Sequence, residues 1–200
     1  MYGLHELNII LASASPRRKS LLEQIGLHPV IMPRPCAELK QLEAGIYAAS
    51  LVRENSRRKA DATHAFYGYS TEALIVAADT VVVLDGQLFG KPADAEQARA
   101  MLRQLSGGAH SVYTGLTLLD GLSGISVSGA ETARVWFSEL DDAVIDEYVA
   151  GGEPLDKAGA YGIQGMGGLL VERIDGDYTT VVGLSLPLLR RLWLELQTLI

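Results

Sequence analysis

The segment 73–84 constrains the fold of this chain more than any other stretch of the sequence. It reads ALIVAADTVVVL and is apolar apart from Asp79 and Thr80. A run of this kind, followed by the turn pair Asp85-Gly86, predicts a buried strand that returns through a hairpin. Because a buried carboxylate without partners is strongly destabilising, Asp79 is expected at a strand end or bulge that faces a cleft, where it holds a metal ion or activates water.

Strands and helices alternate on both sides of this segment. Further strands are expected over 8–12, 28–33, 87–89, 111–119, 125–137, 169–174 and 178–182, the last two joined by a hairpin turn at Asp175-Gly176. Helices are expected from Pro16 with Ser15 as the N-cap, over 44–65, over 94–105, from a capping pattern at Ser138 to residue 149, and over 186–199. Long hairpins mixed with crossover helices predict an α/β fold with an elongated mixed sheet flanked by helices, and they argue against a purely parallel doubly wound fold.

Length and composition are those of an ordinary globular protein. With 200 residues, of which 48% are hydrophobic and 20% charged, the chain is expected to form a single domain over 1–200. No apolar run approaches the roughly 18–20 residues that cross a bilayer, so no membrane association is expected. Residues 1–8 lack a basic region followed by a long apolar stretch, and a cytoplasmic location is therefore expected.

The charges favour a small anionic ligand over a long polyanion. A formal net charge of −7 argues against a protein that binds nucleic acid non-specifically, since phosphate neutralisation needs clustered Lys and Arg. Basic residues are nevertheless concentrated at 17–19 and 57–59, and helical periodicity places Arg57, Arg58 and Lys59 on the solvent side of their helix. A few concentrated cations in an acidic protein suit a small phosphorylated ligand.

The segment from Ser13 to Arg18 is the first candidate binding site. A strand, a polar turn and a helix N-terminus follow one another here, and a helix N-terminus attracts anions through its unpaired N–H groups and partial positive charge. Arg17 and Arg18 in the first turn oppose helix stability, which a bound phosphate chain would explain. Local physics leaves a second interpretation open, a capped surface helix with solvated arginines.

Two loops are further candidates. Lys91 lies between Gly90 and Pro92 and offers a charge to a phosphate, although a solvated loop lysine has the same pattern. The glycine-rich run 156–165 permits a tight backbone near a ligand, and the amide of Gln164 has a donor and an acceptor that can read a base edge. The run lacks the endings of a Walker loop or a dinucleotide fingerprint, and an irregular connecting loop remains the alternative.

The single cysteine and the histidines are not expected to carry chemistry. Cys36 has no histidine close in sequence that could activate it, and one thiol forms no internal disulfide. The four histidines are isolated and show no paired metal-binding spacing.

Five strings of the sequence together resemble the Maf family of nucleoside triphosphate pyrophosphatases. They are LASASPRR at 11–18, ADTVV at 78–82, GKP at 90–92, LSGGAHSVYTG at 105–115 and DKAGAYGIQG at 156–165. The resemblance implies a two-lobed mixed α/β fold around a nucleotide cleft, often dimeric, which makes a homodimer the expected assembly. It also implies hydrolysis of a triphosphate between its α- and β-phosphates with a divalent metal ion, Mg²⁺ or Mn²⁺.

The resemblance also assigns roles to particular residues. It places the catalytic carboxylate at Asp79, and Asp79 together with Glu38 is expected to hold the metal ion. The specificity positions fall on Arg17, Thr80 and Gln164, and the phosphate-binding positions on Ser13, Arg18 and Lys91. The string around Gln164 is similar to that of the subgroup that prefers dTTP and UTP, so Gln164 is expected to pair with a pyrimidine edge.

Two departures from the family pattern bear on activity. Ala37 replaces the first of two adjacent acids, which leaves Glu38 alone, and Asn55 stands where the family usually has a lysine. Arg57 or Arg58 could substitute for that lysine, although their position on the helix differs. The departures favour one rival, a protein that senses a nucleotide or contacts a division-related partner without hydrolysis. A second rival is the same reaction on purine triphosphates.

Overall fold

A seven-stranded mixed sheet runs through the part of the chain that the computed structural model describes, residues 3–39, 47–67 and 72–200. Its strands are β1 (Ile9–Leu11), β2 (Val30–Ile31), β3 (Leu74–Leu84), β4 (Gln87–Phe89), β5 (Ala109–Asp120), β6 (Ser126–Phe137) and β7 (Val171–Asp175). The order is β2-β1-β3-β5-β6-β7, with β4 also paired to β3. The β1 pairings are parallel and the others antiparallel, so the predicted mixed sheet is confirmed.

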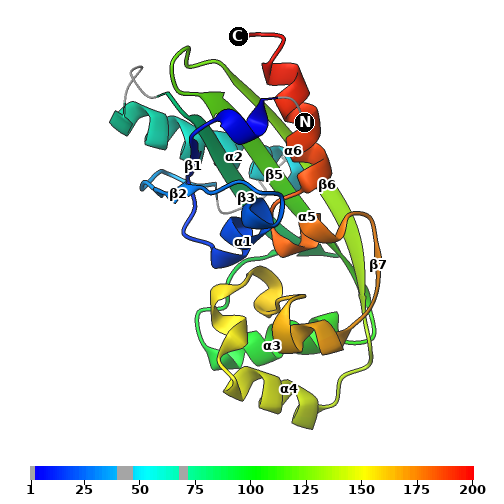
Figure 1. Cartoon of the computed structure of the whole chain (residues 1–200). Coiled ribbons are helices and arrows are strands. Elements are labelled where there is room, and N and C mark those ends of the chain that lie inside the picture. The colour runs from blue at the N-terminus through cyan, green and yellow to red at the C-terminus, as the bar shows by residue number, and fades with distance from the viewer. Residues whose placement is uncertain (1–2, 40–46, 68–71) are drawn as a thin grey trace.

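Helices cover both faces of this sheet (Figure 1). They are α1 (Pro16–Gln24), α2 (Ala48–Tyr67), α3 (Ala95–Leu105), α4 (Asp142–Ala150), α5 (Tyr178–Val182) and α6 (Leu186–Leu196), with short 3-10 helices η1 (Leu4–Glu6), η2 (Glu153–Asp156), η3 (Ala158–Ala160) and η4 (Gly165–Leu170). Alternate residues of β3 point to opposite faces, so Leu74 and Val76 pack with α1 and α6, whereas Ile75 and Ala77 pack with Ala60 of α2.

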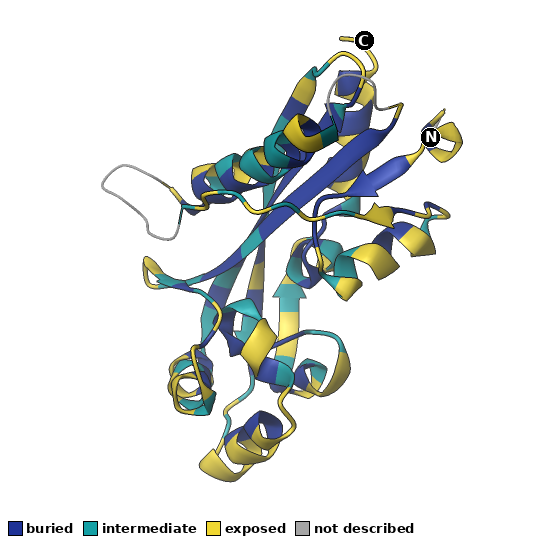
Figure 2. Cartoon of the chain, turned by 90° about the vertical axis from the view of Figure 1, so that its left-hand side faces the viewer, coloured by how far each residue is buried: buried dark blue, intermediate teal, exposed yellow. Residues whose placement is uncertain are grey.

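The long central strands connect two lobes. The upper lobe contains α1, α2 and α6, and the lower lobe contains α3, α4 and the 3-10 helices η2 to η4, packed on the far ends of β5 and β6 (Figure 1). Buried residues concentrate in the upper part of the sheet and inside the lower lobe (Figure 2). Within the described ranges, no helix is long and apolar enough to cross a membrane.

Two predicted elements need correction, and the start of a third lies outside the described residues. Residues 178–182 form α5 and not a strand, because the Asp177 carboxylate accepts hydrogen bonds from the amides of Thr179 and Thr180 and so caps a helix. The N-cap of α4 is Asp141 and not Ser138, so the helix begins three residues later than predicted, at Asp142; the Asp141 carboxylate accepts a hydrogen bond from the Val144 amide. The predicted start of α2 at residues 44–46 lies outside the described residues.

Candidate active site

A break in the edge of the sheet creates the site. On its outer side β3 pairs with β1 only over residues 74–76 and with β4 only over 82–84. The backbone between them, residues 77–81, has no strand on this side among the described residues. A cavity of about 960 Å³ opens at this gap, where the two lobes meet. A short β1 therefore determines where a ligand can approach the central strand.

All the site residues expected from the sequence line this one cavity. They are Ser13, Arg17, Arg18, Glu38, Asp79, Thr80, Lys91 and Gln164. They come from the β1–α1 turn and the first turn of α1, the segment after β2, the middle of β3, the loop after β4 and the glycine-rich run. Residues far apart in the sequence are thus brought together. The structure also adds Asn55 and Lys59 of α2 to the lining.

Asp79 lies in the middle of β3 and is only 8% exposed. It pairs in regular register with Gly115, so the prediction of a strand end or bulge was wrong. Its two carboxylate oxygens have partners instead: Oδ1 accepts from Lys59 Nζ at 2.6 Å and Oδ2 accepts from Asn55 Nδ2 at 2.9 Å. These partners compensate the cost of burying the charge, which was the reason for expecting Asp79 at a strand end or bulge.

Lys59 is the site residue that the sequence interpretation missed. It was expected to face solvent, yet its side chain is only 16% exposed, and its ammonium lies 3.0 Å from Glu38 Oε2 as well as 2.6 Å from Asp79. Arg57 and Arg58 do not replace the missing family lysine, because both form ion pairs with Glu54. The sequence did contain an indication that Lys59 faces the site, because a spacing of four puts Lys59 on the same helix face as position 55.

Close packing holds α2 against the strand beside Asp79. A Cβ atom added at Gly115 would lie 2.2 Å from the carbonyl oxygen of Val52, far inside any normal contact. A second tie is the hydrogen bond of 2.8 Å between the hydroxyls of Ser56 and Thr117. The distance between the Asp79 carboxylate and the Lys59 ammonium is thus set by the packing of the helix on β5.

Arg18 is a fixed cation at the start of α1. Its guanidinium donates to the Gly183 carbonyl (2.8 Å), to Ser13 Oγ (2.9 Å) and to Thr80 Oγ1 (3.1 Å). Burial lowers the pKa of this guanidinium from its ordinary value, with the negative charge of Asp79 acting in the opposite direction. Three hydrogen bonds therefore hold this half-buried side chain against the cavity wall, and its role in phosphate binding stays a prediction.

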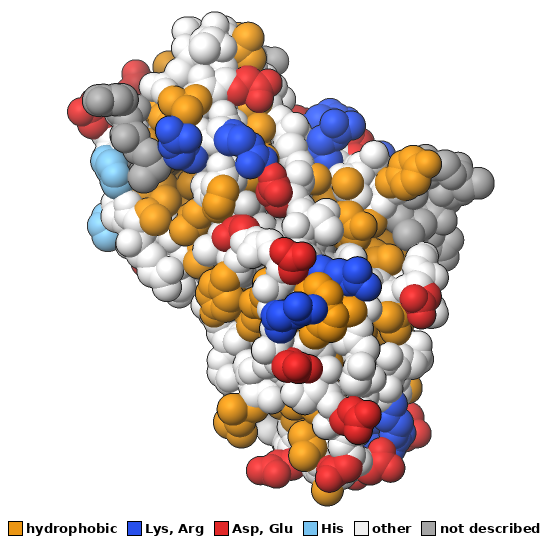
Figure 3. Space-filling view, turned by 90° about the vertical axis from the view of Figure 1, so that its right-hand side faces the viewer, with side chains coloured by type: hydrophobic (Ala, Val, Ile, Leu, Met, Phe, Trp, Pro, Cys, Tyr) orange, Lys and Arg blue, Asp and Glu red, His pale blue; other side chains and the backbone are white. Residues whose placement is uncertain are grey.

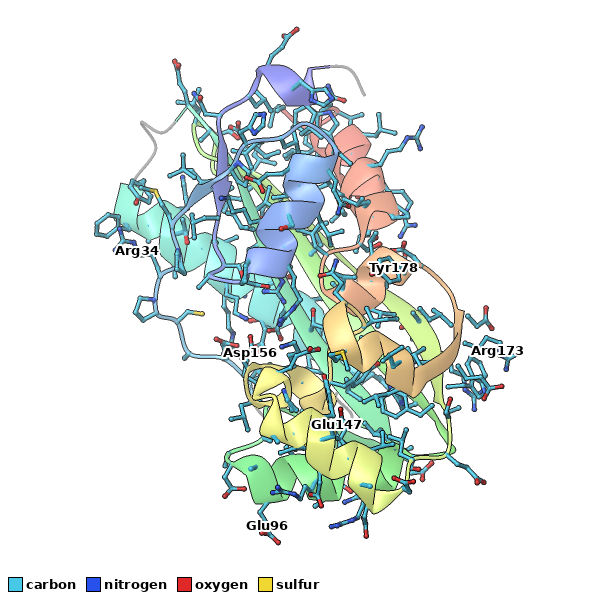
Figure 4. All side chains as sticks on the ribbon, turned by 60° about the horizontal axis from the view of Figure 1, so that its bottom comes forward. Arg34, Glu96, Glu147, Asp156, Arg173 and Tyr178 are labelled. Atoms are coloured by element: carbon cyan, nitrogen blue, oxygen red, sulfur yellow. The ribbon has the colours of Figure 1, made fainter. Side chains whose placement is uncertain are left out.

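The lower lobe contributes the opposite wall of the cavity. Arg17 Nη1 lies 3.5 Å from Asp156 Oδ2, across the gap between α1 and the lower lobe (Figure 4). The loop that carries Lys91 is joined to the glycine-rich run by a hydrogen bond of 3.1 Å from the Gly159 amide to the Gly90 carbonyl. The two lobes therefore contact each other around the cavity.

Cys36 lies in the cavity lining, and the histidines lie outside it. Cys36 lines the cavity, but burial and the charge of Glu38 raise the pKa of its thiol, which disfavours the reactive thiolate. None of the four histidines lines the cavity. His110 is buried in the lower lobe, where its Nε2 hydrogen-bonds to the Tyr161 hydroxyl at 2.8 Å.

The donor set at the gap fits a hard divalent cation that is also bound by a substrate. Among the described residues no cluster of three or more His, Cys, Asp or Glu side chains could hold a metal ion. Asp79 and Glu38 provide carboxylate oxygens that lie close together, because both contact the Lys59 ammonium. Magnesium is commonly bound by one or two carboxylates together with substrate phosphates, and these two residues satisfy that requirement.

The face of the molecule drawn in Figure 3 shows, among its described residues, no continuous basic patch of the kind that a polyanion would need. On the face drawn in Figure 3, Lys and Arg side chains are interspersed with acidic and apolar ones. The concentrated cations belong to the cavity, where Arg17, Arg18 and Lys59 surround a volume of about 960 Å³. Fold and site together define an α/β protein with a cleft between two lobes, lined by arginine and lysine side chains and by Asp79.

Comparison with known proteins identifies the family. Residues 8–196 match the family model described as Maf-like protein, and the chain belongs to this family. A dTTP/UTP pyrophosphatase of Pelotomaculum thermopropionicum is 46% identical over 178 residues, which cover 89% of this chain and 91% of the relative. A nucleoside triphosphate pyrophosphatase of Thermosynechococcus vestitus is 44% identical over 190 residues, 94% of this chain and 92% of the relative. The family resemblance drawn from the five strings is confirmed.

Proposed function

We propose that this protein hydrolyses dTTP and UTP to the nucleoside monophosphate and pyrophosphate. The observation that carries the proposal is the placement of Asp79, fixed by Lys59, in the same cavity as Arg18 and the N-terminus of α1. A buried carboxylate that can orient water and nearby cations that can bind phosphates suit hydrolysis of a phosphoanhydride. Relatives that match most of the chain are named dTTP/UTP pyrophosphatases, which supports this choice of substrates.

The triphosphate is expected to lie along the start of α1. The helix N-terminus and the Ser13 hydroxyl offer hydrogen-bond donors, and Arg17, Arg18 and Lys91 supply positive charge. When water attacks the α-phosphorus, the bond from that phosphorus to the bridging oxygen breaks and pyrophosphate leaves with additional negative charge. Fixed cations that face this charge stabilise the transition state more than the ground state.

Asp79 and Glu38 are the residues that would hold the divalent metal ion. When bound, Mg²⁺ or Mn²⁺ would supply Lewis-acid stabilisation of the phosphate charge and make water more acidic. Asp79 accepts a hydrogen bond from the attacking water and orients it toward phosphorus. Lys59 and Asn55 keep the Asp79 carboxylate in one orientation, so the side chain does not have to reorganise during the reaction.

Base recognition is assigned to the two lobes together. The Gln164 amide can accept a hydrogen bond from N3–H of thymine or uracil and donate one to a ring carbonyl, a pattern that cytosine does not match. Arg17 and Thr80 are the other specificity residues that we propose.

A homodimer and a cytoplasmic location stay predictions, and light scattering of the purified protein checks the first.

A panel of triphosphates with detection of released pyrophosphate tests this proposal. We expect dTTP and UTP to be hydrolysed at least about tenfold faster than the purine triphosphates in the presence of Mg²⁺ or Mn²⁺. Faster turnover of purine triphosphates would contradict the assigned base preference. Binding of dTTP without release of pyrophosphate would contradict hydrolysis and favour the nucleotide sensor.

A further inference from the structure

The backbone that carries Gln164 closes around the side chain of Glu153. The carboxylate of Glu153 in η2 accepts hydrogen bonds from the amides of Met166 (Oε2, 3.2 Å) and Gly167 (Oε1, 3.3 Å). A third hydrogen bond reaches Oε1 from the Tyr148 hydroxyl at 3.0 Å. Residues 162–167 form the glutamine loop. Hydrogen bonds therefore attach the C-terminal end of this loop to the carboxylate of Glu153.

The N-terminal end of the glutamine loop is connected to the same carboxylate, that of Glu153, through the hydroxyl of Tyr148. The Tyr148 hydroxyl accepts a hydrogen bond from the Gly162 amide at 3.1 Å. Burial raises the pKa of this phenol, so it keeps its proton and donates it to Glu153. Gln164 lies between the two attachment points and lines the cavity, whereas Glu153 and Tyr148 do not.

The glutamine loop packs tightly on the carboxylate. A Cβ atom added at Gly165 would lie 3.0 Å from Glu153 Oε2, and one added at Gly167 would lie 2.2 Å from the carbonyl oxygen of Gly162. Gly165 also has a φ of +78°, in the left-handed region that favours glycine. Hydrogen bonds and close contacts thus determine the same conformation of the loop.

From this geometry we propose that Glu153 is a positioning residue that fixes the glutamine loop, presents Gln164 to the base and so sets the base selectivity of the enzyme. The inference rests on the proposed function, because the proposed function assigns the base to Gln164. Glu153 acts only through the loop, since it does not line the cavity.

A carboxylate is the side chain that suits this role. Three N–H or O–H donors converge on Glu153, and an ionised carboxylate offers two acceptor oxygens and no donor. A glutamine at this position would offer one acceptor oxygen and would turn an NH₂ donor toward backbone donors. The substitution Glu153→Gln therefore preserves size and shape while it removes part of the anchor.

The test compares Glu153→Gln with Glu147→Gln. Glu147 is exposed on α4 and lies outside the cavity lining, which makes it a control of the same chemistry (Figure 4). Values of kcat and KM are measured for dTTP and dCTP, which differ at the edge that Gln164 is proposed to read. For Glu153→Gln we expect a raised KM for dTTP and a preference for dTTP over dCTP reduced about tenfold, with kcat lowered far less than in Asp79→Asn. The control should keep the wild-type preference.

A second variant and a second measurement keep the proposal testable. Circular dichroism first establishes that Glu153→Gln is folded. If it is not, Tyr148→Phe takes its place: it removes the hydrogen bonds of the hydroxyl to the Gly162 amide and to Glu153 but keeps the two amide bonds to Glu153, so we expect a smaller change in the same direction. Calorimetric affinities for the α,β-methylene analogues of dTTP and dCTP report the preference without turnover.

Two results would overturn the proposal. One is a folded variant that keeps the wild-type ratio of affinities for the two analogues, and the other is a kcat loss as large as that of Asp79→Asn, which would make Glu153 part of the chemistry. Failure of the proposed hydrolysis is a separate observation, because it appears as a wild-type protein that releases no pyrophosphate. The affinity ratios of the variants are read independently of that result.

Discussion

Replacing Gly115 by alanine should damage stability and activity together. The added Cβ would lie 2.2 Å from the Val52 carbonyl oxygen, and an ordinary contact begins near 3.4 Å. Helix α2 must therefore move away from β5 by about 1 Å. The same helix carries Lys59 and Asn55, whose hydrogen bonds to Asp79 measure 2.6 and 2.9 Å. A displacement of about 1 Å lengthens both to the limit of a hydrogen bond or beyond.

The size of both effects follows from this displacement. Overpacking of a well-packed core destabilises by about 1–3 kcal/mol, and here the obstacle is backbone that cannot change rotamer. Misplacing catalytic groups by about 1 Å reduces turnover by about 100-fold. Urea unfolding followed by circular dichroism measures the free energy of unfolding, and pyrophosphate release from dTTP measures kcat.

Gly108→Ala is the matched control for this substitution. A Cβ atom at Gly108 would lie 3.6 Å from its nearest neighbour, the Leu105 carbonyl oxygen, which is an ordinary contact. This variant should unfold at the wild-type urea concentration and keep the wild-type kcat. A Gly115→Ala protein with unchanged stability and turnover would refute the idea that helix packing sets the geometry at Asp79.

Three further predictions concern pH, charge and metal. Burial lowers the pKa of His110 to about 4, against about 6.5 in an unfolded chain. As the pH falls, the unfolded chain therefore takes up the proton first. The contribution of neutral His110 to the free energy of unfolding is complete above about pH 6.5 and is lost as the pH falls toward about 4. The free energy of unfolding should fall by about 2 kcal/mol between pH 7.5 and pH 5, and by less in His110→Gln. Lys59→Gln should lower kcat on dTTP about 100-fold, and an unchanged kcat would exclude Lys59 from the site chemistry. Removal of divalent metal with EDTA should stop pyrophosphate release and added Mn²⁺ should restore it, whereas full activity in EDTA would exclude a metal.

Much of the framework could be predicted because local patterns decide it. The apolar run over 73–84 has too few polar residues for any place except the interior of a sheet, and it forms β3. Asp94 is an N-cap followed by a helical pattern, and α3 begins directly after it. The cavity-lining residues were also predictable, because several of them belong to strings whose order and spacing identify a family.

The errors arose where distant parts of the chain decide the outcome. Periodicity alone puts a charged residue such as Lys59 on the outside, and only the packing of α2 across β3 gives it Asp79 as a partner. A mid-strand Asp79 is tolerated because Lys59 and Asn55 of α2 pair with its carboxylate, and local sequence does not reveal these partners. Residues 178–182 have the composition of a strand, but the side chain of Asp177 stabilises a helix there.

The most direct test of the account follows the hydrolysis of dTTP by ³¹P NMR with the wild-type protein and with Asp79→Asn. The wild-type protein should produce dTMP and pyrophosphate in equal amounts. The variant should remain folded by circular dichroism and react at least about 1000-fold more slowly, because it loses the charge that orients water and binds the metal. Production of dTDP and orthophosphate, or an undiminished rate in Asp79→Asn, would contradict the central claim.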